Sequence, residues 1–282
     1  MSLRRTGRAV TMGRMTESTI EPEIHGYYER GGERDRLAVS GPGRLEFLRT
    51  RDILRRVLPT GPLSILDVGG AYGVHARWLA EDGHRVHLVD PVPSQVTHAA
   101  TLPGVHATVG DARRLDVPDD HVDATLLLGP LYHLVDAGDR HAALVEALRV
   151  TRPGGLVAVA TISRFAGRLD LLSRHALGAH PGMAAALADV ERTGVHAPAA
   201  YGAFTTAYFH RCEEIALECA RAGLDEVRQY AIEGAAWLVS GIDTDLDDDN
   251  VRELVLDGLR RTETEPSMLG VSSHLLTIGT VD

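Results

Sequence analysis

The sequence predicts an α/β fold in which helices cover both faces of a doubly wound, mostly parallel sheet. Apolar, strand-like runs alternate with helical segments from Ile65 to Ile162, and short connections join them. The stretch 64–73 is typical of a buried strand, a glycine-rich turn and the start of a helix, which is the crossover unit of such folds. With 282 residues, of which 44% are hydrophobic, the chain is long and apolar enough to bury the core of this sheet.

Each element is predicted from the spacing of apolar residues and from the Gly and Pro residues that interrupt it. The first five strands are expected at 65–68, 85–89, 106–109, 124–128 and 156–162. Helices are expected at 44–58, 74–81, 94–100 and 140–150. The last of these helices should end at Thr151, because a proline and two glycines follow.

The regular alternation ends after Ile162. Two helical patches, 168–177 and 181–192, precede a segment that is rich in Gly, Ala and Pro and contains several aromatic residues. We interpret 163–209 as a cap over the carboxyl ends of the strands, where open α/β sheets bind ligands. The remaining elements are a helix at 213–222, a strand at 227–232, a solvated acidic loop at 243–250, a helix at 251–260 and a strand at 274–280.

Charge and composition disfavour several kinds of partner. A net charge of −10 argues against nucleic acids and anionic membranes, because both bind to basic surfaces. No apolar run approaches the ~20 residues that span a bilayer, and no apolar core follows the N-terminal arginines as in a secretory signal. Cys212 and Cys219 lie about two turns apart on a predicted helix, too far for a disulfide. We therefore expect a cytoplasmic protein, and we leave open whether it forms a homodimer.

Carboxylates flank the glycine turn and indicate which ligand it holds. Asp67 lies two residues before the first glycine, where a carboxylate would repel a pyrophosphate but would attract a cationic amine. The glycines at 69, 70 and 73 allow the chain to turn tightly and a ligand to approach the backbone. Asp90 ends the second strand, a position from which a carboxylate binds two ribose hydroxyls.

In these motifs the chain resembles the class I S-adenosylmethionine (SAM)-dependent methyltransferases, and the resemblance covers about residues 24–162. The first motif of that family, acid-x-Gly-x-Gly-x-Gly, stands here as Asp67-Val68-Gly69-Gly70-Ala71-Tyr72-Gly73. Asp111 after the third strand and Arg152-Pro153-Gly154-Gly155 before the fifth also match the family. Ala71 departs from it, because it replaces the middle glycine and leaves slightly less room for the cofactor.

The resemblance implies SAM as the cofactor and a seven-stranded sheet with an antiparallel last strand, and the helical cap interpreted above would then follow strand five. Substrate recognition should lie beyond residue 162, where the resemblance is loose. The implied organisation is a disordered tail at 1–20, an N-terminal lid segment and helix at 21–60, a SAM-binding Rossmann-like core at 61–162, an inserted substrate cap at 163–209 and the C-terminal part of the core sheet at 210–282.

Roles for individual residues follow from the same resemblance. Tyr28 of the lid and Arg49 would hold the methionine end of SAM, and Asp67 would attract its ammonium group. Asp90 would bind the ribose, and Asp111 would accept from the adenine amino group. The complete set of expected cofactor-binding residues is Tyr28, Arg49, Asp67, Gly69, Gly70, Ala71, Gly73, Asp90, Pro91, Asp111, Ala112, Leu128, Gly129 and His133.

The loop after the fourth strand lies beside the reacting methyl group in this family. His133 in this loop could accept a proton from a substrate hydroxyl, contact the methionine tail of SAM, or pack inertly. No pair among the fourteen histidines has the spacing of a metal site, so no metal is expected. Acceptor contacts are expected from aromatic residues, although those of the cap could equally pack its own small core. These residues are Tyr132, Phe165, Tyr201, Phe204, Tyr208 and Trp237.

These features predict a SAM-dependent methyltransferase that acts on an oxygen or nitrogen atom of a small, apolar or aromatic metabolite. Two alternatives stay open. An NAD-dependent oxidoreductase would share the crossover and Asp90, but the turn does not match Gly-x-Gly-x-x-Gly and Asp67 precedes it. A non-catalytic SAM-binding protein would keep the fold without the reaction.

Overall fold

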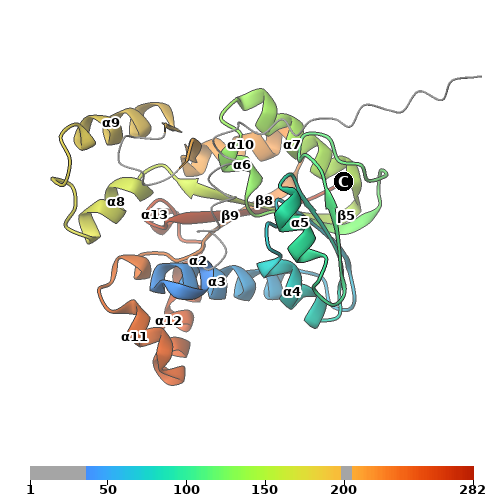
Figure 1. Ribbon diagram of the computed structural model, residues 1–282, viewed down its shortest axis with the longest axis horizontal. Coiled ribbons are helices and arrows are strands. Elements are labelled where there is room, and N and C mark those ends of the chain that lie inside the picture. The colour runs from blue at the N-terminus through green and yellow to red at the C-terminus, as the bar shows by residue number, and fades with distance from the viewer. Residues whose placement is uncertain (1–35, 198–204) are drawn as a thin grey trace, which may run out of the picture.

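A computed structural model of the chain describes residues 36–197 and 205–282. Within these residues, seven strands form a central sheet in the order β3-β2-β1-β4-β5-β9-β8, with helices on both faces (Figure 1). The first five strands are parallel, and β9 is antiparallel to both β5 and β8, which confirms the predicted fold class. The strands are β1 (Ser64–Val68), β2 (Arg85–Asp90), β3 (Val105–Val109), β4 (Val122–Leu127), β5 (Thr151–Ser163), β8 (Asp225–Ala231) and β9 (His274–Thr280).

Strand residues alternate between two apolar layers, one on each face of the sheet. In β1, Leu66 and Val68 pack into one core and Ile65 into the other, as the two-residue period of a strand requires. The first core is covered by α7 (Ala137–Val150) and α10 (Cys212–Ala222). The second core is covered by α3 (Gly41–Val57), α4 (Val74–Glu81) and α5 (Pro93–Ala99). Figure 1 shows α7 and α10 on one side of the sheet and α3 and α4 on the other.

Strand β5 begins earlier than the sequence predicts. Thr151 already pairs with Val122, and a register shift then brings Leu156 opposite Ala124. The amide of Gly154 donates to the carbonyl of Val281 at 2.7 Å. The Pro-Gly-Gly segment therefore ends α7 as expected, but it continues as an irregular start of the strand rather than as a loop.

Beyond β5, the chain forms two helices at the end of the sheet, α8 (Ala166–Ser173) and α9 (Met183–Thr193). Two short strands that the sequence did not predict follow, β6 (Val195–His196) and β7 (Ala207–His210). They pair with each other, and β7 pairs in parallel with the last residues of β5. The proposed boundaries of the cap and of the N-terminal lid stay predictions, and residues 1–35 and 198–204 lie outside the described structure.

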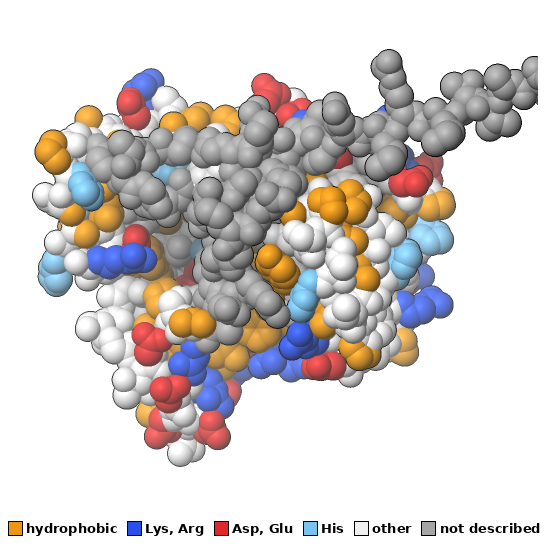
Figure 2. Space-filling view, viewed as in Figure 1, with side chains coloured by type: hydrophobic (Ala, Val, Ile, Leu, Met, Phe, Trp, Pro, Cys, Tyr) orange, Lys and Arg blue, Asp and Glu red, His pale blue; other side chains and the backbone are white. Residues whose placement is uncertain are grey.

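The acidic stretch 243–250 is helical, and the predicted loop is wrong. It forms α11 (Ile242–Asp247) and the first turn of α12 (Asp249–Thr262), because Ile242 and Leu246 pack against Leu45 and Trp237. Acidic and basic side chains are interspersed over these two helices (Figure 2). The remaining described helices are α2 (Arg36–Val39), α6 (Pro130–His133), the 3₁₀ turn η1 (Ala236–Leu238) and α13 (Pro266–Leu269).

Cys212 and Cys219 both lie on α10 as free thiols, and burial raises the pKa of the Cys219 thiol to about 12. Among the helices of 36–197 and 205–282, none has the length and apolar character to cross a membrane.

Candidate functional site

The glycine turn joins β1 to α4 in a conformation that side chains would obstruct. Gly69 and Gly73 adopt φ values of +70° and +78°, and Gly73 caps the start of α4. A Cβ added to Gly69 would lie 2.8 Å from Cδ of Pro130. A Cβ added to Gly70 would lie 2.6 Å from both Oδ2 of Asp67 and Cδ1 of Leu88. The turn therefore needs glycine at 69 and 70 to let β1, β2 and the loop after β4 approach one another.

Ala71 occupies the left-handed region, with a φ of +48°. A side chain in this region costs about 1–2 kcal/mol, because its Cβ crowds the following carbonyl oxygen. The amide of Ala71 donates to Oδ2 of Asp90 at 2.9 Å, which fixes the turn against the end of β2. The one departure from the glycine motif therefore keeps the backbone shape that a glycine would adopt, at a cost in conformational strain.

A cavity of about 660 Å³ opens at the carboxyl ends of β1, β2 and β4. Among the expected cofactor residues, Gly73 is not part of its lining, because it lies at the start of α4. The expected residues that do line the cavity are Asp67, Gly69, Gly70, Ala71, Asp90, Pro91, Asp111, Ala112, Leu128, Gly129 and His133.

Asp67 presents a buried carboxylate to this cavity. Its side chain is 1% exposed, and neither carboxylate oxygen has a hydrogen-bond partner within the described residues. Burial, together with the neighbouring charge of Asp90, raises the pKa of Asp67 to about 7. A carboxylate without partners in this setting is a site for a cationic ligand, because a positive charge would restore the ionised form.

Asp90 differs from Asp67 because backbone amides already orient it. Its Oδ1 accepts from the amide of Val92 and its Oδ2 from the amide of Ala71, both at 2.9 Å. Burial raises the pKa of Asp90 to about 6, and the two amide hydrogen bonds oppose that shift. Each carboxylate oxygen keeps further acceptor capacity, so Asp90 can also accept from ligand hydroxyls.

Asp111 lies on the rim of the cavity in an ion pair with Arg113. The guanidinium donates to both carboxylate oxygens of Asp111, and at 2.8 Å to Asp139 on α7. The sequence did not single out Arg113, although it lies two residues after a predicted site residue. An adenine amino group bound at Asp111 would share this carboxylate with the guanidinium.

His133 lies deep in the same cavity wall at the end of α6. Its ring packs edge-on against Tyr132, with centroids 4.6 Å apart. Burial lowers the pKa of His133 to about 4, and a hydrogen bond to the Thr206 backbone opposes that shift. The imidazole is therefore neutral at physiological pH and accepts a proton weakly.

A second cavity of about 700 Å³ adjoins the first and is bounded by α8, α9 and the ends of β5, β7 and β9. Aromatic side chains at its wall are Tyr132, Phe209 and Trp237. Glu46 and Tyr132 line both cavities, so the two spaces meet at these residues. The arrangement therefore offers two adjoining spaces, each large enough for a small ligand.

The sequence profile of a methyltransferase-domain family matches residues 65–155, the stretch from β1 into β5 that supplies most of the first cavity. Residues 65–155 form a class I methyltransferase domain. The methyltransferase domain also has curated relatives. An uncharacterised methyltransferase of Mycobacterium tuberculosis is 36% identical over 100 residues, which are 35% of this chain and 40% of that protein.

The malonyl-[acyl-carrier protein] O-methyltransferase of Serratia marcescens is 32% identical over 127 residues, 43% of this chain and 48% of that enzyme. The chain thus spans less than half the length of these two curated relatives. Solved structures match the chain over most of its length. A possible histamine N-methyltransferase from Thermotoga maritima covers 92% of this chain and 99% of its own, at 18% identity and a TM-score of 0.57. A SAM-dependent methyltransferase from Archaeoglobus fulgidus covers 90% and 99%, at 16% identity and a TM-score of 0.55. At these identities the likeness concerns the fold alone.

The structure contradicts the predicted role of Arg49 at the methionine end of the cofactor. Its side chain is fully buried on the inner face of α3 and is not part of the lining of either cavity. The guanidinium donates to Ile232 O at 3.0 Å, to Asp52 at 2.6 Å and to Glu263 at 2.5 Å. Arg49 therefore pairs with Asp52 on its own helix and with Glu263, and the second pair joins α3 to the C-terminal part of the chain. Tyr28, the other residue expected at the methionine end, lies outside the described residues.

Among the expected acceptor residues, Tyr132 and Trp237 line the second cavity, whereas Phe165 and Tyr208 do not. The ring of Tyr208 instead packs against the guanidinium of Arg140 on the opposite face of β7. The distance from Cζ of Arg140 to the centroid of the ring is 3.9 Å. Phe209 takes the cavity-facing position, because neighbouring strand residues point to opposite faces. Recognition of β7 as a strand would have identified Phe209. Tyr201 and Phe204 lie outside the described residues.

Proposed function

We propose that the protein transfers a methyl group from SAM to an oxygen or nitrogen atom of a small, apolar or aromatic acceptor. The observation that supports this most strongly is the buried, unpartnered carboxylate of Asp67 on a methyltransferase-type turn. It faces a cavity that meets a second one at Glu46 and Tyr132. A SAM-like cation in the first space would therefore lie next to an acceptor in the second.

The residues around the first cavity fit the chemical groups of SAM. Asp67 would hold the ammonium, Asp90 the ribose hydroxyls, and Gly69 and Gly70 would leave room beside the backbone. When bound, SAM supplies a methyl group that its positive sulfur activates. The partnerless Asp67 disfavours the NAD-dependent alternative, because a buried carboxylate beside the turn would repel a pyrophosphate.

The protein's own contribution would be alignment of the acceptor and exclusion of water, which can lower the barrier by roughly 7–11 kcal/mol. With its pKa lowered to about 4, His133 is a poor base, so we assign it to the methionine tail of SAM rather than to proton transfer. An amine acceptor needs only its neutral form. The named relatives and structural neighbours include both an O- and a possible N-methyltransferase, so both acceptor atoms belong to the proposal.

Calorimetric titration of the full chain with SAM, S-adenosylhomocysteine and NAD tests the cofactor. We expect both sulfur compounds to bind with 1:1 stoichiometry and NAD to bind much more weakly. Tight binding of NAD without binding of SAM would overturn the proposal.

A panel of phenols and amines incubated with methyl-labelled SAM tests the reaction. Label transfer to at least one member is expected, whereas binding of SAM without transfer to any member would favour a non-catalytic SAM-binding protein. We further propose that the protein acts on small molecules, since its charge of −10 disfavours nucleic acid. We also propose a cytoplasmic location, with which its two free cysteines agree.

A further inference from the structure

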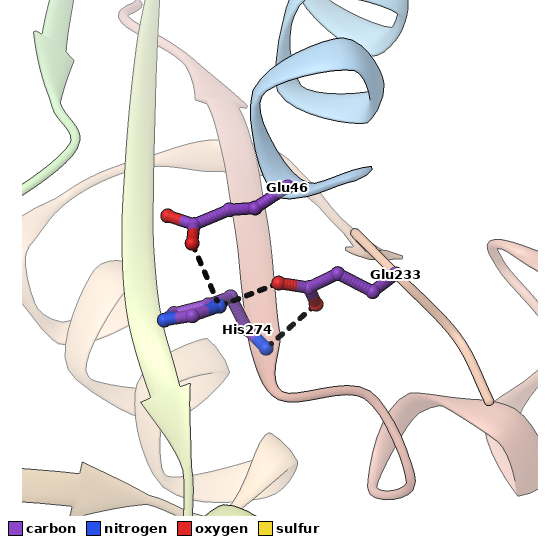
Figure 3. A group of neighbouring side chains, drawn as sticks. All are labelled: Glu46, Glu233 and His274. Carbon is purple, nitrogen blue, oxygen red and sulfur yellow. Dashed lines mark hydrogen bonds and ion pairs between the residues drawn. The ribbon is translucent and has the colours of Figure 1, made fainter. Parts of the chain in front are cut away.

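We propose that Glu46, Glu233 and His274 form a binding site for a divalent transition-metal ion in the wall of the second cavity. They come from α3, from the segment after β8 and from the first residue of β9, and Figure 3 shows their side chains converging. One potential ligand atom from each residue lies within 4.8 Å of those of the other two. Metal binding at this site can be measured without methyl transfer, whereas the choice of ligand in the second cavity rests on the proposed function. The site revises the expectation, drawn from histidine spacing, that the chain has no metal site.

Nδ1 of His274 is the centre of the cluster. It lies 2.6 Å from Oε1 of Glu233 and 3.7 Å from Oε2 of Glu46. Ions such as Zn²⁺ form bonds of about 2.0–2.2 Å to nitrogen and oxygen, which places neighbouring donor atoms roughly 3–3.5 Å apart. Small side-chain rotations would bring the three atoms to this spacing, with the ion replacing the proton between Glu233 and the imidazole.

Glu233 is held in place by hydrogen bonds to the carboxylate oxygen that does not contact the imidazole. Its Oε2 accepts from Oγ of Ser272 at 2.8 Å and from the backbone amide of His274 at 2.9 Å. The Ser272 hydroxyl in turn accepts from the amides of Glu233 and Gly234 at 3.0 and 3.1 Å. This support leaves Oε1 directed at Nδ1 of His274, and such outer hydrogen bonds are typical of carboxylates that ligate metals.

The charge of the cluster also favours a cation. The Glu233 side chain is 1% exposed, and His274 is the one group among its described partners that can carry a positive charge. A divalent ion would compensate this buried carboxylate, and the imidazole would bind the ion in its neutral form. One imidazole with two carboxylates suits Zn²⁺ or Mn²⁺ better than Mg²⁺, which prefers oxygen ligands and retains its water.

The position of the site connects it with the cavities. Glu233 and His274 line the second cavity, and Glu46 lines both. An ion held by three protein ligands has further coordination positions, and here those positions would face the space for the acceptor. The ligand that enters this cavity would therefore be one with an oxygen or nitrogen atom able to coordinate the ion.

Titration of the chelator-treated, tag-free full chain with zinc sulfate, and separately with manganese chloride, tests the proposal. We expect one ion of zinc to bind per chain. His274→Asn and Glu46→Gln should weaken zinc binding by at least roughly 100-fold, and Ser272→Ala by roughly tenfold, as for outer-shell partners. Glu46→Gln is used in place of Glu233→Gln, because Glu46 is less buried than Glu233. Its substitution should therefore disturb the fold less while still removing one ligand.

His141→Asn is the matched control, because His141 is an exposed histidine on α7, outside the cluster. It should bind zinc as the wild type does. Absence of zinc binding, or equal affinity of the wild type and His274→Asn, would overturn the metal site. Titration of the same samples with SAM separates this result from the proposed function, because SAM binding without zinc binding refutes the metal site alone.

Discussion

The two cavities are adjacent, but they are assembled from the chain in different ways. The first is lined by residues between 67 and 139, with the additions of Leu37, Glu46 and Thr206. The second is lined by residues of α3, α8, α9, β7, η1 and the start of β9, and the lining residues extend from Ser40 to His274 in the sequence. A site of the first kind depends mainly on backbone shape at strand ends, whereas one of the second kind depends on how distant side chains pack.

Because of this difference, the two cavities should tolerate amino-acid substitutions in their linings to different degrees. The glycine turn has contacts that leave no room for an added Cβ, so small changes there should act strongly on the cofactor. Side chains of the second cavity come from separate elements and can change one at a time. We therefore expect acceptor specificity to vary more readily than cofactor binding, and the following predictions test the cofactor side of that contrast.

The largest effect is expected from Gly70→Ala. The new Cβ would meet Asp67 and Leu88 at 2.6 Å, and both side chains are buried and have little room to move. Calorimetry should show SAM affinity reduced by roughly 100-fold, or about 2.8 kcal/mol. Gly178→Ala is the matched control, because a Cβ there meets nothing within 4 Å. Equal SAM affinity in the two variants would show that the backbone of the turn does not shape the cofactor site.

Asp90→Ala should weaken SAM binding by more than roughly tenfold, or about 1.4 kcal/mol. The substitution removes both the expected ribose acceptor and the carboxylate that accepts from the amides of Ala71 and Val92. The exposed Asp116→Ala serves as the control in the same titration, with circular dichroism to show that the fold is kept. An unchanged affinity for Asp90→Ala would place the ribose elsewhere.

The pH dependence of SAM binding should reveal Asp67. Its pKa is about 7 in the free protein, and an ammonium group favours the ionised carboxylate. Affinity should therefore rise by roughly tenfold between about pH 6 and pH 8, and Asp67→Asn should remove that dependence. If the SAM affinity of the wild type depended on pH as little as that of the variant, the ammonium group of SAM would not bind to Asp67.

The same carboxyl group affects stability in the absence of SAM, with the opposite sign. Its pKa is raised on folding, so the folded state binds the proton more tightly than the unfolded chain. The resulting stabilisation is fully present below the ordinary pKa of 3.8 and is lost as the pH rises through about 7. Thermal melts of the wild type and Asp67→Asn over this range measure the effect.

The smallest effect is expected from Ala71→Gly. Glycine relieves the cost of a φ of +48°, but it also increases the entropy of the unfolded chain. The balance should raise the free energy of unfolding by roughly 0.5 kcal/mol, measurable in chemical denaturation. A decrease in stability would mean that the methyl group of Ala71 makes packing contacts that outweigh its strain.

The sequence was informative where function depends on local backbone. Asp67, the glycines and Asp90 follow one another within a single crossover, so their order predicts both the fold and the first cavity. Arg49 shows the limit of that reasoning. Its position near the lid predicts a ligand contact, but one of the two acids that neutralise it, Glu263, lies 214 residues away in the chain.

The second cavity was predictable only in part, because its side chains depend on tertiary packing. The short strand β7 has only four residues, so the sequence provides no clear alternation by which to separate Tyr208 from Phe209, and the predicted acceptor set contains Tyr208 whereas Phe209 lines the cavity. The cluster of Glu46, Glu233 and His274 joins three distant segments, and no spacing of histidines along the chain could have indicated it. Likewise, the acidic residues of α11 indicate a solvated loop, whereas the burial of Ile242 and Leu246 against distant residues stabilises a helix.

Because Glu46 and Tyr132 line both cavities, a ligand in one cavity can affect the affinity measured for a ligand in the other. A molecule that repositions either side chain from one space changes the surface met by a molecule in the other. Any resulting free energy of coupling must be reciprocal, so cofactor and acceptor would alter each other's affinity by the same factor. Binding constants measured with one cavity vacant would then differ from those of the ternary complex, and acceptor screens are better performed in the presence of saturating S-adenosylhomocysteine.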